Sequence, residues 1–261
     1  MNVLPKKSLG QNFLVNQGVV GKIISASELT SQDTVLEVGP GTGNLTRALI
    51  ASGARIVAVE KDRRLFEDLS AEFSAVQIEI IQGDILKIKP TDLGLPDGYK
   101  IVANLPYNIT SHFLKKIFEE TPKPSLAVLM VQKEVARRIV SSPSEMSLLA
   151  LSVQYFAYPK IVFQVSRGSF RPEPDVDSAV IKLSTKKILP LSEEDRVKFF
   201  RLARTAFGGK RKQLINTLGN IYKNKTKNEL SGILSKAGVA PKARPETLSL
   251  DDWLNLTKAM P

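Results

Sequence analysis

Cysteine is absent from the 261-residue sequence, and histidine occurs once, as His112. Without cysteine the chain can form neither disulfides nor thiolate metal sites, and a single histidine without partner ligands predicts neither a metal site nor a catalytic one. No apolar run is long enough to span a membrane, and the first residues lack the apolar core of a signal peptide. These absences predict a cytoplasmic protein with no bound metal and no membrane partner.

The positive charge of the chain is concentrated in its last third. The formal net charge is +11, with 21 Lys/Arg against 19 Asp/Glu in residues 1–184 and 16 against 7 in residues 185–261. Such a basic region is typical of proteins that bind a polyanion, most often nucleic acid through its phosphates. A solvated, lysine-rich surface gives the same numbers, and charge alone leaves both explanations open.

Short apolar, β-branched runs alternate with helix-like segments over the first two thirds of the chain. This alternation predicts an α/β fold, with a mostly parallel sheet covered by helices on both faces. The last two runs have no long helix between them and are expected to form an antiparallel pair at one edge. The predicted strands are Thr34–Val38, Ile56–Val59, Ile78–Ile81, Ile101–Ala103, Leu126–Val131, Ile161–Val165 and Ala179–Leu183, and the helices among the early strands are Leu45–Ala51, Arg63–Phe73 and Ser111–Glu119.

The sequence changes character just before residue 190. Four helix-like segments follow, and Ser192, with an acid three residues later, is the predicted N-cap of the first. We therefore expect residues 1–187 to form one domain and residues 188–261 to form a small, basic, all-α domain. The four predicted helices are Glu193–Ala206, Lys210–Leu218, Lys227–Ala237 and Asp251–Met260.

Three glycines, Gly39, Gly41 and Gly43, follow the first predicted strand and open a helix. They allow a tight turn and a close approach of a ligand to the backbone. Their G-x-G-x-G spacing differs from the G-x-G-x-x-G of dinucleotide enzymes, and no Gly-Lys-Ser/Thr indicates a phosphate loop of the NTPase type. An ordinary strand–helix turn also explains the glycines alone, so their meaning depends on their neighbours.

Acidic residues stand at the ends of successive predicted strands. Glu37 precedes the glycines, Glu60 ends the second strand and Asp84 follows the third. The Glu60 position suits the two hydroxyls of a ribose, and the Asp84 position suits an adenine amino group. Three carboxylates repel a pyrophosphate but attract a cation. The predicted cofactor is therefore S-adenosylmethionine, which has an adenosine, a sulfonium charge and no phosphate; taken singly, each acid is also explained as a solvated strand-end residue.

Residues 104–107, Asn-Leu-Pro-Tyr, end the fourth predicted strand. The Asn104 side-chain oxygen and the Leu105 carbonyl, turned inward by Pro106, are suited to accept both hydrogens of a purine amino group. Tyr107 would stack on the base. This arrangement predicts methyl transfer to a base nitrogen, driven largely by positioning, on a base that is single-stranded, looped or flipped. A plain turn in which Asn and Pro are only turn formers is the alternative.

Several longer motifs occur in order along almost the whole chain. They are Leu9-Gly-Gln-Asn-Phe-Leu, Glu37-Val-Gly-Pro-Gly-Thr-Gly, Glu60, Gly83-Asp84, Asn104-Leu-Pro-Tyr-Asn-Ile, Gln132-Lys-Glu-Val-Ala-Arg-Arg, Phe170-Arg-Pro-Glu-Pro-Asp-Val-Asp-Ser-Ala and Ala206-Phe-Gly-Gly-Lys-Arg-Lys-Gln-Leu. Together they resemble the small-subunit (16S) ribosomal RNA adenine N6,N6-dimethyltransferases, relatives of the erythromycin-resistance adenine methyltransferases and of mitochondrial transcription factor B. The resemblance implies a Rossmann-like class I S-adenosylmethionine-dependent methyltransferase with a seven-stranded sheet. It also implies dimethylation of two adjacent adenosines near the 3′ end of small-subunit rRNA, a step of ribosome biogenesis.

The resemblance implies roles for residues that spacing alone does not identify. Residues 10–13 would act as an N-terminal flap, and Phe170 falls where the family places a second aromatic ring near the target base. A core phenylalanine beside a proline-rich turn is the alternative for Phe170, and Ser166 stands where the family usually has proline. The implied cofactor-site residues are Asn12, Leu14, Gly39, Gly41, Glu60, Asp84 and Asn104.

The family's C-terminal signature matches residues 204–212 and implies contacts with RNA phosphates. Three cations at a predicted helix N-terminus are unfavourable for the helix dipole, which favours a role beyond stability. The expected partner is the small ribosomal subunit or its precursor, bound by a monomer. The implied RNA-binding residues are Arg204, Lys210, Arg211 and Lys212, with Arg137 and Arg138 extending the same surface.

Two alternatives to this function remain open from the sequence. One is a large-subunit methyltransferase of the antibiotic-resistance type. The other is a non-catalytic RNA-binding assembly or transcription factor with the same fold. The intact acids Glu60 and Asp84 and the intact Asn104-Leu-Pro-Tyr argue against a protein without the chemistry.

Overall fold

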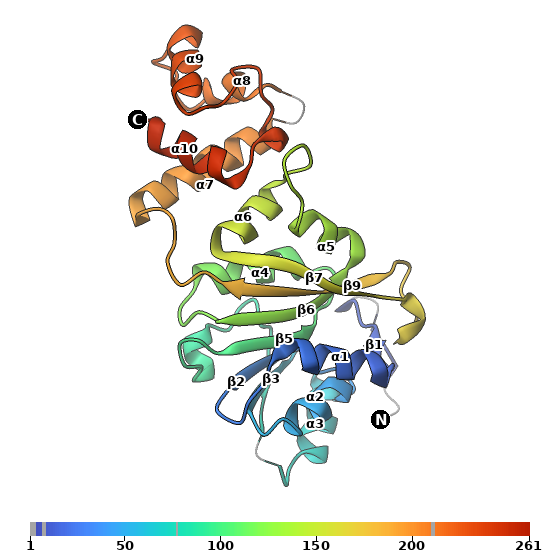
Figure 1. The fold of residues 1–261 in the computed structure, drawn as a ribbon. Helices are drawn as coiled ribbons and strands as arrows, with labels where there is room; N and C mark the ends of the chain where they lie inside the picture. The colour runs from blue at the N-terminus through green and yellow to red at the C-terminus, as the bar shows by residue number, and fades with distance from the viewer. Residues whose placement is uncertain (1–3, 7–8, 77, 210–211) are drawn as a thin grey trace. The chain divides into compact units, whose positions relative to one another are not determined.

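A seven-stranded sheet forms the centre of the first part of the chain (Figure 1). The computed structural model describes residues 4–6, 9–76, 78–209 and 212–261. The strands of the sheet are β2 (Thr34–Val38), β3 (Arg55–Glu60), β4 (Ile78–Gln82), β5 (Lys100–Asn104), β6 (Leu126–Gln132), β7 (Ala157–Val165) and β9 (Ser178–Thr185). Their order across the sheet is β4-β3-β2-β5-β6-β9-β7.

The sheet is mostly parallel, as the sequence predicts. Strand β2 pairs parallel with β3 and with β5, β3 pairs parallel with β4, and β5 pairs parallel with β6. Strand β9 pairs antiparallel with β6 and has β7 as its other neighbour. The chain runs outward from β2 to β4 and returns to β5 on the other side of β2. This reversal opens a crevice at the carboxyl ends of the strands, the usual ligand site of such sheets.

Helices cover both faces of the sheet. Neighbouring strand residues point to opposite faces, and both Val35 and Leu36 are buried, as are both Ile101 and Val102. Helix α1 packs against β5, β6 and α2, whereas α3 packs against β3 and β4. The helices of this part are α1 (Gln17–Ser27), α2 (Asn44–Ile50), α3 (Arg63–Glu72), α4 (Thr110–Glu119) and the start of α5 (Lys133–Ile139), with the 3₁₀ turns η2 (Pro90–Leu93) and η3 (Arg167–Ser169).

The segment that enters α1 is fixed by a second, two-stranded sheet. Strand β1 (Phe13–Leu14) pairs antiparallel with β8 (Phe170–Arg171). The Val15 N–H then donates to the Ser169 carbonyl at 2.9 Å. The Asn16 side chain accepts from the Val19 N–H at 3.2 Å and so caps α1. These contacts hold the N-terminal segment in one place just before α1.

The chain divides into two compact units. The first consists of residues 1–136 and 158–185, and the second of residues 137–157 and 186–261. The predicted boundary at 187/188 lies close to the break at 185/186, but the sequence did not indicate that residues 137–157 belong with the C-terminal helices. The helices of the second unit are the end of α5, α6 (Leu148–Phe156), α7 (Glu193–Gly208), α8 (Leu214–Leu218), α9 (Lys227–Lys236) and α10 (Leu250–Ala259), with the 3₁₀ turn η4 (Pro245–Thr247).

Aromatic packing explains why α6 belongs with the C-terminal helices. The Tyr155 ring centroid lies 4.9 Å from that of Phe199 and 5.3 Å from that of Phe200, both on α7. Ring pairs at such distances bury large apolar areas and add a specific attraction. Two turns further along α7, Phe207 stacks on the buried Trp253 of α10 at 5.7 Å. The second unit therefore has its own core.

The ends of the C-terminal helices agree only in part with the prediction. Ser192 caps α7, because its hydroxyl accepts from the Asp195 N–H at 3.2 Å. Helix α8 begins at Leu214 rather than at the predicted 210, and Lys212 precedes it without helical structure. The helix-dipole argument therefore does not apply to Lys212. Among the helices built from described residues, none combines the length and the apolar character needed to cross a bilayer.

Candidate active site

A pocket opens at the carboxyl ends of β2, β3, β4 and β5, at the point where the strand order reverses. It is lined by backbone and side chains from every one of these strand ends and from the N-terminal segment. Ten residues that the sequence assigned to the cofactor or the base lie around this one pocket. They are Asn12, Leu14, Gly39, Gly41, Glu60, Asp84, Asn104, Leu105, Pro106 and Tyr107.

The glycine turn forms the floor of the pocket. Gly39 and Gly41 have φ of 66° and 62°, in the left-handed region where residues with a Cβ are strained. A Cβ on Gly41 would also lie 3.0 Å from Cδ1 of Phe13, closer than normal contact. The Gly39 N–H donates to the Val59 carbonyl at 2.9 Å, which ties the turn to β3. Glycine is therefore needed here both for conformation and for space.

Glu60 is held by backbone donors on two sides of the pocket. One carboxylate oxygen accepts from the Gly41 N–H at 3.1 Å, and the other accepts from the Asp62 N–H at 2.8 Å. The residue is 5% exposed. Burial raises the pKa of Glu60, although these hydrogen bonds act in the opposite direction. The carboxylate is thus fixed at the end of β3, between the glycine turn and α3.

Glu37 is a buried acid with an unpaired oxygen in the pocket wall. It is 1% exposed, and within the described part of the chain its Oε2 has no hydrogen-bond partner. Burial, opposed by the Thr46 hydroxyl and with a further contribution from the charge of Glu60, raises the pKa of Glu37 to about 8. Because a nearby cation favours the ionised form, this wall suits a ligand that carries positive charge and no phosphate. The donor set therefore fits S-adenosylmethionine.

Asp84 stands at the end of β4 with its carboxylate already oriented. It accepts from Lys61 Nζ at 2.9 Å and from the Leu86 N–H at 3.0 Å. Partial burial acts to raise the pKa of Asp84, but the bonds from Lys61 and Leu86 outweigh it and lower the pKa. The residue is therefore an ionised acceptor at the end of β4, and β3 lies between β4 and the strand that leads into the glycine turn.

The N-terminal segment crosses the pocket and contacts two of its walls. The Asn12 carbonyl accepts from Nδ2 of Asn104 at 3.1 Å, and the Leu14 carbonyl accepts from Nδ2 of Asn44 at 2.7 Å. Residues 9–14 all line the pocket. The flap implied by the family resemblance, residues 10–13, therefore lies in the lining of the pocket.

Asn104 and the residues after it form the remaining wall. Because Nδ2 of Asn104 donates to Asn12, its Oδ1 is left as an acceptor for a ligand. The Leu105 N–H donates to the Met130 carbonyl at 3.2 Å, which fixes the peptide that follows Asn104. The Tyr107 hydroxyl and the Ser178 hydroxyl share a hydrogen bond of 2.7 Å, and burial raises the pKa of Tyr107. The ring is thus anchored by its tip and neutral.

Phe170 is not brought into this pocket. Its side chain is 0% exposed and packs in the apolar core with Val20, Ile23 and Val128. Its neighbourhood is the β1–β8 pair, not the lining of the pocket. In this arrangement the ring supports the N-terminal segment, and the base-stacking role stays a prediction. Ser166, in place of the family's proline, caps the 3₁₀ turn before Phe170.

The predicted RNA-binding residues that the structure describes lie in the second unit. Arg137 and Arg138 are in the last turn of α5, Arg204 is on α7, and Lys212 precedes α8; all four are exposed. Lys210 and Arg211 lie outside the described residues. The acids and the histidine that the structure describes form no cluster able to hold a metal ion.

Sequence reasoning missed the residues whose side chains hold the predicted site residues in place. Asp62 follows Glu60 by two positions, accepts from Gln11 and Lys6, and caps α3. Asn44 holds Leu14, and Lys61 holds Asp84. An N-cap signal was present in the sequence at Asp62, just before the predicted helix at 63, but the partners of these side chains are distant in sequence.

The chain matches a family model and many curated proteins over nearly its whole length. A family model described as ribosomal RNA adenine dimethylase matches residues 3–260. A ribosomal RNA small subunit methyltransferase A from Dehalococcoides mccartyi is 44% identical over 95% of this chain and 86% of that protein. A protein of the same name from Chlamydia abortus is 42% identical over 97% of this chain and 90% of its own.

Two solved structures resemble the protein over most of both chains. A dimethyladenosine transferase from Plasmodium falciparum has a TM-score of 0.80 and 30% identity, covering 94% of this chain and 95% of that one. The 23S rRNA methyltransferase ErmE has a TM-score of 0.76 and 26% identity, covering 95% of this chain and 99% of that one. The likeness therefore extends over the residues of both units.

Proposed function

Because the chain belongs to the ribosomal RNA adenine dimethylase family, we propose that it transfers methyl groups from S-adenosylmethionine to the N6 amines of two adjacent adenosines near the 3′ end of small-subunit rRNA. The main support for this proposal is that Glu37, Glu60 and Asp84 line the same pocket as residues 104–107. The small subunit is favoured over the large because the relatives above 40% identity are named for the small subunit, whereas ErmE is 26% identical.

The acids and the glycine turn hold the cofactor. Glu60 would hold the ribose hydroxyls, Asp84 would hold the adenine amino group, and the buried Glu37 would favour the positive charge of the cofactor. When bound, S-adenosylmethionine supplies an electrophilic methyl group. The N-terminal segment, held on Asn104 and Asn44, excludes water from this side of the pocket.

The Asn104–Tyr107 wall holds the amine of the target base. Oδ1 of Asn104 and the Leu105 carbonyl accept its two hydrogens, which keeps the nitrogen lone pair aimed away from the wall. Tyr107, fixed through Ser178, stacks on the ring. A nitrogen that gains a methyl group becomes acidic, so its proton leaves without a strong base. After one transfer a single hydrogen remains for one of the acceptors, and the same wall serves a second transfer.

The exposed cations of the second unit bind the RNA backbone. Arg204 and Lys212 are solvent-exposed and belong to a C-terminal region with 16 Lys/Arg against 7 Asp/Glu. Phosphate contacts position the RNA and carry no sequence information. Choice of the target base is therefore left to the pocket, which only an unpaired base enters.

The test is a methylation assay with the full-length chain. Cofactor labelled in its methyl group is incubated with unmethylated small subunits and, separately, with large subunits, and the rRNA is digested to nucleosides. We expect label in N6,N6-dimethyladenosine from the small subunit. Label confined to the large subunit would indicate the resistance-type activity. No label in either, with RNA binding intact, would indicate a non-catalytic RNA-binding protein.

A further inference from the structure

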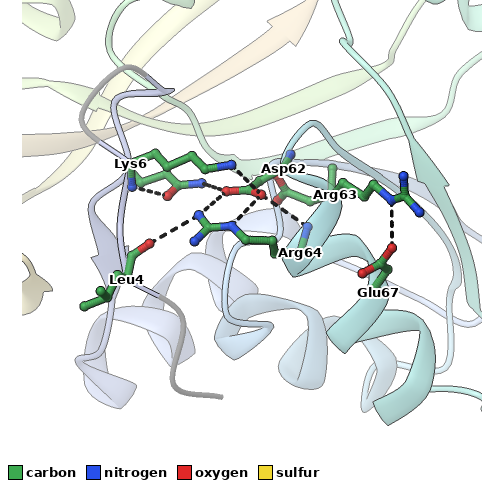
Figure 2. Close-up of polar contacts among 8 residues, drawn as sticks. Leu4, Lys6, Asp62, Arg63, Arg64 and Glu67 are labelled. Atoms are coloured by element: carbon green, nitrogen blue, oxygen red, sulfur yellow. Dashed lines mark hydrogen bonds and ion pairs between the residues drawn. The ribbon is translucent and has the colours of Figure 1, made fainter.

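The carboxylate of Asp62 has more partners than its position requires. Its side chain is 0% exposed although it stands at the start of α3. An N-cap needs only one bond, which the Arg64 N–H supplies at 3.2 Å. The guanidinium of Arg64 adds bonds of 3.1 and 2.7 Å, and Lys6 Nζ and Gln11 Nε2 add bonds of 3.2 and 3.1 Å. Figure 2 shows this cluster between the N-terminal segment and the start of α3.

The partners of Asp62 join two parts of the chain that are distant in sequence. Lys6 and Gln11 belong to the N-terminal segment, and the Lys6 N–H donates to Oε1 of Gln11 at 2.7 Å. Arg64, on α3, also donates to the Leu4 carbonyl at 3.3 Å (Figure 2). The carboxylate and the guanidinium together therefore hold the described residues on either side of positions 7 and 8.

Asp62 also bonds to two residues that line the pocket, Glu60 and Gln11. Its N–H donates to Glu60, the acid placed at the ribose, at 2.8 Å. On its other side, Gln11 lines the pocket and is followed by Asn12, whose carbonyl is bound by Asn104. One residue thus contacts both the strand-end acid and the segment that crosses the pocket.

The electrostatics of the cluster make it a firm attachment. Hydrogen bonds from Arg64 above all, with those from Gln11 and Lys6, hold the pKa of Asp62 well below its ordinary range against the effect of burial. The carboxylate is therefore ionised, and its bonds are charge-assisted. Moving the N-terminal segment away would replace the charge-assisted bonds from Lys6 and Gln11 by bonds to water, which is unfavourable.

We propose that Asp62 is a positioning residue that latches the N-terminal segment over the cofactor pocket, and that the bond from Gln11 to Asp62 is the part of the latch that governs cofactor retention. This inference rests on the proposed function, since it assumes that the pocket holds S-adenosylmethionine. The latch acts on the affinity for the cofactor, and the Asn12 carbonyl keeps its own bond from Asn104 when the bonds to Asp62 are removed.

The test compares three variants of the full-length chain. Asp62→Asn keeps a capping side chain, but its amide would set a donor against the donor of Gln11. Gln11→Ala removes one bond and leaves the helix cap untouched. Glu67→Gln is the matched control, because it removes a carboxylate of the same helix whose bond to Arg63, 2.7 Å long, is exposed (Figure 2). Binding of S-adenosylhomocysteine is measured by calorimetry, and steady-state kinetics are measured on small subunits.

We expect Kd for S-adenosylhomocysteine and KM for the cofactor to rise about tenfold in Asp62→Asn and about threefold in Gln11→Ala, while kcat changes less than about twofold. Glu67→Gln should match the wild type. A merely structural role for Asp62 would lower kcat and the melting temperature without this split. Unchanged affinity in Asp62→Asn, or an equal loss in Glu67→Gln, would overturn the latch.

Limited proteolysis gives a readout that does not depend on activity. Trypsin cleaves after lysine, and the latch predicts that S-adenosylhomocysteine slows cleavage after Lys6 in the wild type but not in Asp62→Asn at saturating ligand. Equal protection in both proteins would overturn the proposal. Failure of the wild type to bind S-adenosylhomocysteine at all would instead reject the proposed cofactor, and the latch with it.

Discussion

The pocket of the first unit and the helices of the second use charge in opposite ways. In the pocket, Glu37 and Glu60 are 1% and 5% exposed, and the proposed function has each act on a small ligand at short range. In the second unit, Arg204 on α7 and Lys212 before α8 are exposed, and the proposed function has them share RNA binding with many other cations. A buried charge is screened little and an exposed one is screened strongly. Single substitutions should therefore be decisive in the pocket and gradual on the helices.

The largest effect is expected for Asn104→Ala. Removing the side-chain acceptor leaves the target amine held only by the Leu105 carbonyl, and kcat should fall about 10²-fold or more, by analogy with the loss of one donor from an oxyanion hole. Single-turnover methylation of small subunits measures this. RNA affinity, measured by filter binding, should stay within about twofold of the wild type. A fall in RNA affinity as large as the fall in kcat would contradict the separation of the two regions.

Glu60→Gln should come next. The amide keeps the size of the side chain but loses the charge that Gly41 and Asp62 N–H groups now bind. We expect Kd for S-adenosylhomocysteine to rise about tenfold, measured by calorimetry, because charge-assisted bonds are weakened. RNA affinity serves as the control and should not change. An unaltered Kd would remove Glu60 from the cofactor site.

The third prediction concerns pH and Glu37. The pKa of this acid is raised from 4.5 to about 8 by burial, so the folded protein retains its proton where the unfolded chain releases it. The unfolding free energy should therefore fall, relative to Glu37→Gln, as the pH rises from about 5 to 8.

Urea unfolding without cofactor at both pH values measures this difference, which should reach about 1 kcal/mol or more. The half-exposed Glu79, replaced by Gln, is the control and should show no such divergence. Parallel curves for the wild type and Glu37→Gln would show that the pKa of Glu37 is not raised in the folded protein.

The smallest effect is expected for Arg204→Ala. Loss of one exposed cation should weaken RNA binding by about two- to fivefold and should reduce the slope of log K against log salt by about 0.9 or less. Filter binding over a range of KCl concentrations measures both. Lys115→Ala, an exposed cation of the first unit, is the matched control and should change neither. A total loss of binding in Arg204→Ala would show that the helical surface does not act as a sum of many contacts.

Local sequence pattern was sufficient for the seven strands of the main sheet and for the helices among its early strands. It did not indicate α1, α5 or α6. The buried strands were recognisable as runs of β-branched residues. Parallel pairing brings their carboxyl ends to one edge of the sheet. Glu60 and Asp84, which end successive strands, therefore lie around one pocket without further information. Ser192 was recognisable as an N-cap for the same local reason.

Long-range contacts account for what the sequence did not show. Residues 137–157 join the C-terminal helices because Tyr155 meets Phe199 and Phe200, and no local pattern indicates this. Phe170 resembles a base-stacking residue by its motif, yet it packs in the core. Helix α8 begins late because periodicity defines a face of a helix more sharply than its first residue.

The nitrogen and the oxygen of the Asn104 side-chain amide have different roles. Its nitrogen donates to the Asn12 carbonyl, so the orientation of the amide is set by the protein and only the oxygen faces a ligand. Aspartate would place an oxygen against that carbonyl with no hydrogen between them, which makes it a poor substitute despite its shape. An acceptor fixed in this way binds a hydrogen-bond donor, such as an amine, and repels another acceptor, such as a carbonyl oxygen. Adenine presents an amine at its sixth position and guanine presents an oxygen, so under the proposed function the same bond that holds the N-terminal segment would also let the pocket reject the wrong purine.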